Sequence, residues 1–406
     1  MRKSVSHGSY AFFLGSLLLG CSAGSSAVGG TGEDSTSGES TSTTSSAQGG
    51  AGAGSTGTFV DPSTGGNVVS NCMAGADEDF DMDGFTITNG DCNDCDANVN
   101  PGAIEVGMED AMGGMGGYQA ADEDCDGTAD NPAPPCDTAL AIQGTDPMDG
   151  ARAIELCKVA GNGSWGVESA QWVRANGTPS AATLHSGTLD GFGTNVLPRA
   201  GGRLLAISSG QARDMNDAGY VTNSSYTFNG PGTPPPGFPQ NVPGCSGGSN
   251  INDDVGLDLQ IKAPTNATGY SFDFRFYSFE YPEWVCTTYN DQFIALVNPA
   301  PTGAINGNIS FDSMNNPVSV NIAFFDVCSG CALGTGDLQG TGFGDFEGAT
   351  GWLQTSAPIQ GGTTFNLRYA IWDTGDSALD STSLIDNFKW VANGGTVSVG
   401  TIDVPQ

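Results

Sequence analysis

Residues 270–278 read YSFDFRFYS, and this stretch decides the fold of the chain. Aromatic side chains alternate here with polar ones, the aromatic set being Tyr270, Phe272, Phe274 and Phe276. Successive side chains of an extended strand point to opposite faces, so a period of two places all these rings on one face. The stretch therefore predicts a β-strand whose aromatic face lies in a hydrophobic core.

The same kind of pattern recurs along the second half of the chain. Alternation is found in residues 257–261, 318–324 and 365–371, and shorter apolar runs fall at 165–174, 204–208, 292–297 and 384–391. Loops rich in Gly, Pro and Asn separate these segments. Many short strands without intervening helices indicate a mainly β fold, an antiparallel β-sandwich of the jelly-roll type. We expect it over residues 136–406, with a partly helical entrance between Cys136 and Cys157.

The charge of the chain excludes one class of partner. Lys and Arg total 12 against 45 Asp and Glu, a formal net charge of -33. A phosphate backbone would be repelled, so we expect no nucleic-acid partner. Between Lys3 and Arg152 the sequence contains neither Lys nor Arg. The carboxylates crowded into residues 77–137 therefore need another source of positive charge, and we expect metal ions to supply it.

Residues 1–20 have the pattern of a signal peptide, because a basic start precedes an apolar stretch too short to span a bilayer. The ending LLGC at 18–21 resembles the lipobox of bacterial lipoproteins. The resemblance implies cleavage before Cys21, a lipid on its thiol and, because Ser22 follows, delivery to the outer membrane. We expect a lipid-anchored protein exposed on the cell surface, with the membrane as a partner.

Residues 21–70 are composed mainly of Ser, Gly, Thr and Ala. Few large apolar residues occur there, so folding could not recover the backbone entropy that it would lose. We interpret this segment as a disordered tether that carries the folded part away from the membrane.

Residues 71–131 form an acidic, cysteine-containing segment in which D-x-D-x-D-G occurs twice, beginning at Asp79 and at Asp122. Alternate carboxylates in a tight loop can point at one centre, and hard oxygen donors at this density suit calcium. Neither copy is a complete EF-hand, because Gly90 and Ala133 stand where a bidentate Glu is needed. The candidate ligands are Asp79, Asp81, Asp83, Asp91, Asn93, Asp96, Asp122, Asp124, Asp126 and Asp130.

The runs DMDGF, GDCNDCDANVNPGAIE and DEDCDG in this segment resemble the metal-binding repeat of bacterial surface proteins. That repeat is similar to thrombospondin type 3 calcium loops, in which disulfides hold together a core made of ions. The resemblance implies several calcium ions in a small irregular module. The alternative is an acidic solvated linker with incidental cysteines.

The sequence contains 11 cysteines, and Cys21 is set aside by the lipobox. The other ten suit disulfides in an oxidising compartment. Two pairs are plausible by elimination, Cys245 with Cys286 and Cys328 with Cys331. The partners of the remaining cysteines stay open: Cys72, Cys92, Cys95, Cys125, Cys136 and Cys157.

Acidic residues gather where the strand alternation stops, in FEYPEWVCTTYNDQF at 279–293 and AIWDTGDSALDS at 370–381. Antiparallel pairing of the strands that Glu280 closes and Asp291 opens would place both at one end of the sandwich. A cation would relieve the repulsion between close carboxylates, whereas loop caps are the plainer explanation. The candidate ligands here are Glu280, Asp291, Asp373, Asp376 and Asp380.

These two stretches resemble the choice-of-anchor L domain of bacterial surface proteins, most clearly from Ile251 to Val391. The resemblance implies placement at the cell surface rather than an activity. Here the anchor would be the N-terminal lipid.

Catalytic residues are hard to find in this sequence. Only His7 and His185 are present, and we expect the latter to be a surface residue with no catalytic role. Our first hypothesis is a non-catalytic protein for adhesion or for binding a glycan or protein, with Trp284, Tyr289, Trp352 and Trp372 as aromatic surfaces or core residues. The alternatives are a polysaccharide hydrolase using Glu280 and Glu283, and a metal-buffering protein.

Overall fold

The computed structural model describes residues 74–106, 121–131, 133–161, 164–181, 183–322, 324–392 and 396–406. The predicted signal peptide, the tether, Cys21 and Cys72 lie outside these ranges. Within them, no helix combines the length and the apolar character that crossing a membrane requires.

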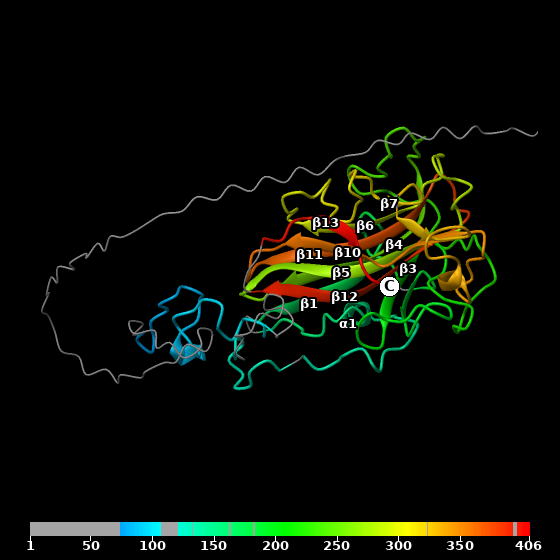
Figure 1. Cartoon of the computed structure of the whole chain (residues 1–406). Coiled ribbons are helices and arrows are strands. Elements are labelled where there is room, and N and C mark those ends of the chain that lie inside the picture. The colour runs from blue at the N-terminus through cyan, green and yellow to red at the C-terminus, as the bar shows by residue number, and fades with distance from the viewer. Residues whose placement is uncertain are drawn as a thin grey trace, which may run out of the picture. The chain divides into compact units, whose positions relative to one another are not determined.

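Two antiparallel sheets make up the body of the described chain (Figure 1). The first contains, in spatial order, β1 (Gly166–Val173), β4 (Ile251–Lys262), β11 (Thr364–Thr374), β6 (Gln292–Asn298) and β7 (Val318–Ser319). The second contains β13 (Gly400–Asp403), β10 (Leu353–Pro358), β5 (Ala267–Ser278), β12 (Ser381–Ala392), β3 (Leu204–Ser208) and β2 (Ser186–Leu189). In addition, β9 (Gly348–Thr350) pairs with β5, and β8 (Phe325–Val327) pairs with β9. The helical elements are short: α1 (Pro147–Arg152), η2 (Ile87–Asn89) and η4 (Gly336–Leu338).

Aromatic side chains from the two sheets meet in the main hydrophobic core. The ring of Phe272 on β5 lies 5.0 Å from that of Tyr369 on β11, and Phe274 lies 5.2 Å from Phe293 on β6. All four side chains are fully buried. The aromatic face predicted for residues 270–276 is therefore confirmed, and with it the mainly β, antiparallel sandwich.

The polar face of β5 is also buried, which the sequence pattern did not indicate. Asp273 and Arg275 are 0% and 1% exposed. Arg275 pairs with Asp337 at 2.8 Å, and Asp273 accepts from Arg199 at 3.1 Å. A second apolar cluster, which includes Tyr277, covers this outer face. Ion pairs thus allow a strand with polar alternation to be buried on both sides.

Most predicted strands are present, but the one expected over 318–324 is wrong. The chain there forms only the two-residue strand β7, because the backbone N of Ile322 donates to the carbonyl of Ser319 at 3.0 Å and closes a turn. Five short strands were not predicted: β2, β8, β9, β10 and β13. The partly helical entrance is α1.

The acidic segment is hydrogen-bonded to the turn between β4 and β5. The backbone N of Thr265 donates to the carbonyl of Gly102 at 2.9 Å. Ile104 exchanges two hydrogen bonds with the side chain of Asn266, at 3.1 and 2.9 Å. The turn sequence NPGAI at 100–104 thereby fastens this segment to the sandwich.

Disulfides are present, as predicted. The bonded pairs are Cys92–Cys125, Cys136–Cys157, Cys245–Cys286 and Cys328–Cys331. Cys95 is disulfide-bonded as well. The first pair joins the GDCND stretch, which follows the first D-x-D-x-D-G copy, to Cys125 of the second copy across 33 residues of sequence.

Candidate metal centres and a polar pocket

The two D-x-D-x-D-G loops have the same internal hydrogen bonds. In the first, Oδ2 of Asp79 accepts from the backbone N of Gly84 at 3.1 Å, and in the second, Oδ2 of Asp122 accepts from Gly127 at 3.0 Å. Both glycines have left-handed backbone, with φ of 97° and 92°. A side chain with a Cβ rarely adopts that conformation, so the glycine of the motif permits the turn. The sequence repeat is therefore also a structural repeat.

Carboxylates in the acidic segment lie close enough to share a cation. Four groups of three have ligand oxygens within 4.8 Å of one another. The groups are Asp79, Asp81 and Asp83; Asp81, Asp91 and Asp94; Glu105, Asp122 and Asp124; and Glu105, Glu123 and Asp130. Each group uses only oxygen donors, which is the ligand chemistry of calcium.

Several of these oxygens are buried without a hydrogen-bond donor among the described residues. They include Oδ2 of Asp81, of Asp83 and of Asp91, the last residue being 4% exposed. Burial, followed for Asp81 by the charge of Asp83, raises the pKa of Asp81 and Asp91 to about 6. A buried carboxylate oxygen without a donor is costly unless a cation binds it, so this donor set fits calcium.

Glu105 and Glu123 were missed as candidate ligands. Burial raises the pKa of Glu105 to about 7, and Glu105 belongs to two of the four groups. The signal was present in the sequence, because both residues are part of the NPGAIE and DEDCDG runs. Two predicted ligands, Asp96 and Asp126, do not belong to the four groups. Oδ1 of Asp96 accepts from the backbone N of Asn98, and both oxygens of Asp126 accept hydrogen bonds.

A second set of carboxylates is buried where the two sheets of the sandwich meet at one end. Asp291 precedes β6, and Asp373 lies near the end of the neighbouring strand β11. Oδ1 of Asp291 accepts from the backbone N of Thr374 at 3.0 Å, and its Oδ2 accepts from Oγ of Ser381 at 2.7 Å. Because Ser381 begins β12 in the other sheet, Asp291 links the two sheets.

Glu280 and Asp291 lie together, but not by the predicted pairing. β5 and β6 belong to different sheets, so the chain crosses from one sheet to the other between them. The backbone N of Asp291 donates to Oε2 of Glu280 at 3.4 Å. Burial, then the neighbouring Asp291, raises the pKa of Glu280 to about 10. Burial also raises the pKa of Asp291 to about 7.

Asp373 and Asp380 are 1% and 3% exposed. Neither oxygen of Asp373 has a hydrogen-bond donor among the described residues. Burial, then Asp291, raises its pKa well above the usual range, and burial raises that of Asp380 to about 8. These strand-end carboxylates do not form a group of three within 4.8 Å, unlike those of the acidic segment.

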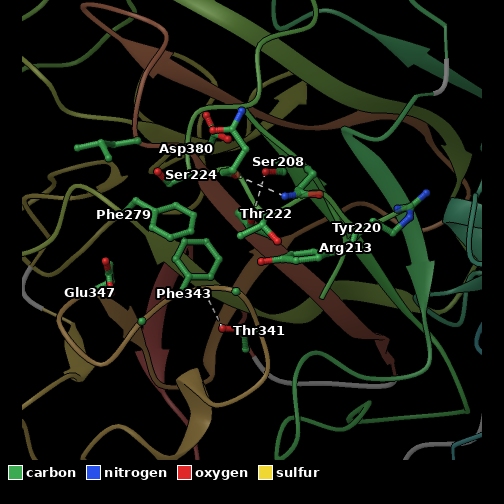
Figure 2. Close-up of a pocket in the computed structure, with 16 residues that line it drawn as sticks. Ser208, Arg213, Tyr220, Thr222, Ser224, Phe279, Thr341, Phe343, Glu347 and Asp380 are labelled. Atoms are coloured by element: carbon green, nitrogen blue, oxygen red, sulfur yellow. Dashed lines mark hydrogen bonds between the residues drawn. The ribbon is translucent and has the colours of Figure 1, made fainter. Parts of the chain in front are cut away.

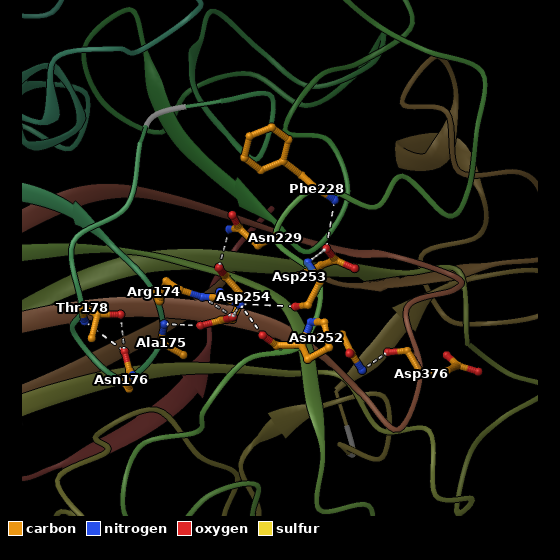
Figure 3. A network of polar contacts seen from close by, with 12 residues as sticks. Arg174, Ala175, Asn176, Thr178, Phe228, Asn229, Asn252, Asp253, Asp254 and Asp376 are labelled. Atoms are coloured by element: carbon orange, nitrogen blue, oxygen red, sulfur yellow. Dashed lines mark hydrogen bonds and ion pairs between the residues drawn. The ribbon is translucent and has the colours of Figure 1, made fainter.

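Asp376 lies at the surface, apart from the buried set. Its Oδ1 accepts from the backbone N of Ala378 at 3.2 Å, and its carbonyl accepts from Asn252 at 2.6 Å (Figure 3). In the same network Asp254 is buried but accepts from Nε of Arg174 at 2.9 Å. Asp254 therefore has a cationic partner, whereas the strand-end carboxylates have none in the ion pairs of the described residues.

Residues considered for catalysis do not form a common site. Glu280 is buried, whereas Glu283 is exposed in the following turn. The expectation that His185 lies at the surface is wrong, since it is fully buried, with Nδ1 2.9 Å from the carbonyl of Ser208. Burial lowers the pKa of His185. Trp352 and Trp372 are core residues, whereas Trp284 is 39% exposed.

A polar pocket of about 480 Å³ opens beside Asp380 (Figure 2). Its wall comes from the end of β3, the loop 220–224, Phe279 after β5, the loop 341–347 and the start of β12. Hydroxyl and amide side chains predominate, and the rings of Phe279 and Phe343 stack at 4.1 Å. No pattern of alternation or spacing in the sequence indicated this pocket, because it is assembled from distant loops.

Residues 243–388 match the family model of the choice-of-anchor L domain. The match runs from just before β4 almost to the end of β12, and it includes the strand-end carboxylates. It confirms the resemblance found in the sequence and indicates a cell-surface protein. No curated protein matches the chain.

Proposed function

We propose that this chain is a calcium-stabilised, non-catalytic protein of the outer membrane surface, anchored by a lipid on Cys21, that binds a glycan or protein ligand. The observation that carries the calcium part is the pair of equivalent D-x-D-x-D-G loops, whose carboxylates form groups of three without Lys or Arg nearby in the sequence. The choice-of-anchor L match supports the surface part.

Calcium would act here as a structural link. Asp79, Asp81 and Asp83 would hold one ion, and Glu105, Asp122 and Asp124 another. A bound ion supplies positive charge and fixes the loop oxygens around it. The disulfide between Cys92 and Cys125 joins the second loop to the residue after Asp91, which shares a group with Asp81 of the first loop, so ordering one favours ordering of the other.

A cation at the end of the sandwich is a second, separate proposal. Its support is Asp373, which is 1% exposed and has both oxygens buried without a donor. Because these carboxylates do not form a group of three, a cation there would also need carbonyl or amide oxygens as ligands. Oδ1 of Asn290 is one such oxygen, since it is buried without a donor among the described residues.

Calorimetric titration of the calcium-free full chain with calcium tests the metal proposal. We expect a few tightly bound ions per chain. Asp79→Asn and Asp122→Asn should each reduce this number, whereas Asp345→Asn, a control at an exposed position, should leave it unchanged. Many weak, exchangeable ions would favour metal buffering. Undetectable binding would contradict the proposal.

Surface placement has its own test. Protease added to intact cells that produce the protein should remove the sandwich, and Cys21→Ser should release the protein from the membrane fraction. Protection of the sandwich in intact cells, with cleavage only after lysis, would place the protein elsewhere.

A polysaccharide hydrolase is not supported by the positions of Glu280 and Glu283. A glycosidase needs two carboxyl groups that face one open substrate site. Here one carboxyl is buried and the other is exposed. The unsubstituted chain should therefore leave polysaccharides intact, which product analysis can check. Turnover that Glu280→Gln or Glu283→Gln abolishes would contradict this.

A further inference from the structure

Free hydroxyl groups line one side of the pocket beside Asp380. The side chains of Tyr220, Thr222 and Ser224 make no hydrogen bond to the described residues, and all three line the pocket. They belong to one loop and are exposed or half-buried. These groups are available both to donate to a ligand and to accept from it.

Two carboxylates on the pocket wall lack donors. Oδ1 of Asp380 and Oε2 of Glu347 are buried and have no hydrogen-bond partner among the described residues. Asp380 is 3% exposed, and its other oxygen accepts from the backbone N of Tyr226 at 2.7 Å. Asp380 is thus held in place with one acceptor left for a donor from outside the chain.

An aromatic surface lies between these polar groups in the view of Figure 2. Phe279 and Phe343 stack with ring centres 4.1 Å apart and planes at 22°. Phe343 is packed further against Tyr277 at 5.4 Å, so the pair is anchored in the second apolar cluster. Phe279 is half-buried and presents an apolar face to the pocket.

The remaining polar side chains of the wall are already committed. Oγ of Ser208 donates to the carbonyl of Ser381 and accepts from Thr382, both at 2.9 Å. Oγ1 of Thr341 donates to the carbonyl of Leu338 at 2.7 Å. A wall fixed in this way loses little conformational freedom when a ligand binds.

The charge of the pocket restricts its ligand. Arg213 is buried, and its Nη1 donates to the carbonyls of Ser186 and Ala212. Its Nε has no hydrogen-bond partner among the described residues. With two carboxylates on the wall and a net charge of -33, an anionic ligand would be repelled.

We propose that this pocket binds a neutral saccharide, whose hydroxyl groups bind Asp380, Glu347 and the 220–224 loop while its C–H face packs on Phe279. The volume of about 480 Å³ lies within the range of small-ligand sites. The proposal rests on the surface-binding function above and names the class of ligand and its site.

Saccharide binding by the purified full chain, saturated with calcium, tests this. Saturation-transfer NMR and calorimetry would use glucose, galactose, mannose and N-acetylglucosamine, each as monosaccharide and disaccharide. We expect at least one to bind. Phe279→Leu should weaken binding about tenfold, and Ser224→Ala about threefold, as expected for loss of one apolar contact and one hydrogen bond. Phe346→Leu is the matched control, since Phe346 is 80% exposed and lies outside the pocket wall.

Three results would overturn the proposal. One is the absence of binding to every saccharide by a chain shown to be folded, and another is binding that neither pocket variant weakens. The third is binding of tetramethylammonium chloride, with displacement by no sugar, which would make the pocket a cation site. Thr222→Ala and Ser224→Ala change exposed or half-buried hydroxyls only, so the test holds even if Phe279→Leu fails to fold.

The saccharide-binding result can be distinguished from the outcome of the surface and calcium tests. Sugar binding is measured on purified protein and does not depend on where the cell places it. If the surface or calcium test fails but sugar binds, the pocket assignment stands. If sugar does not bind but the surface and calcium tests succeed, only the proposed saccharide ligand is rejected.

Discussion

The acidic segment and the sandwich bury different kinds of atoms. Among the described residues of the acidic segment, the buried apolar side chains are Val99, Ala103, Val106 and Ala121, and the centre is made of carboxylates and disulfides. The sandwich has an extensive apolar core, and several of its buried carboxylates are paired with arginine. One region should depend on ions for its shape, and the other on hydrophobic burial.

Chelation should therefore separate the two regions, and this is the largest effect we expect. Removal of calcium with EDTA should abolish protection from hydrogen exchange in residues 74–106 and 121–131, because the like-charged loops lose their cations. Strands β5 and β11 should keep their protection. Deuterium uptake followed by mass spectrometry measures both in one sample.

The comparison fails if the acidic segment stays protected after complete chelation. Magnesium added in place of calcium is the control, because it demands a smaller, octahedral site and should restore protection poorly. Equal restoration by both ions would show that charge alone, without the geometry of the loops, holds the segment.

A core substitution should destabilise the sandwich rather than the acidic segment. Phe274→Ala removes a ring that is 0% exposed and packs 5.2 Å from Phe293. We expect the free energy of unfolding of the sandwich to fall by about 3–5 kcal/mol. Phe346→Ala, at an 80% exposed position, should change it by less than about 0.5 kcal/mol. Urea unfolding monitored by circular dichroism gives both values, and equal effects would contradict the assigned core.

Loss of one disulfide should weaken the acidic segment alone. Cys92→Ser with Cys125→Ser opens a link that spans 33 residues, which stabilises by roughly 4 kcal/mol in the chain-entropy account. Because ion binding is coupled to folding, calcium affinity should fall by up to about a hundredfold. The matched control, Cys245→Ser with Cys286→Ser, lies in the sandwich and should leave that affinity unchanged. Calorimetry compares the two, and similar losses would mean that the calcium sites depend on the sandwich.

The sequence predicted the strands that show alternation or an apolar run, except over 318–324, and missed the strands that show neither. The aromatic period of 270–276 gave β5, and 204–208 gave β3 within its observed bounds. β10 was missed because its inward residues, Leu353, Thr355 and Ala357, alternate in burial but hardly in hydrophobicity. Burial on both faces of β5 could not be predicted either, since it depends on Arg199 and Asp337 from distant loops.

Candidate sites divide in the same way. The D-x-D-x-D-G spacing is local, so the groups that contain Asp79, Asp81 and Asp83 could be predicted from the sequence. Crossing between sheets decides which strand ends meet, and this is why Glu280 and Asp291 came together by a route other than the predicted one. The pocket is wholly a product of that tertiary arrangement.

The smallest effect concerns a buried carboxyl group of the sandwich that has no arginine. Oε2 of Glu155 accepts from the backbone N of Asn387 at 2.9 Å, and its Oε1 is buried without a donor among the described residues. Burial, then the charge of Asp386, raises the pKa of Glu155 to about 9 from an ordinary value of 4.5. The folded state therefore holds this proton more tightly than the unfolded state does.

The sign of the pH dependence follows from that difference. Stability from Glu155 is fully present below about pH 4.5 and is lost as the pH rises toward about 9. Glu155→Gln keeps the neutral shape and should flatten the profile, so that the variant is more stable than the parent at pH 8. Glu168→Gln, at an exposed position, is the control. The urea midpoint of each protein is measured at pH 5, 6.5 and 8. Saturating calcium is present throughout, so that the carboxylates of the acidic segment stay bound to ions. Parallel profiles for all three proteins would mean that burial of Glu155 does not lower the stability of the sandwich.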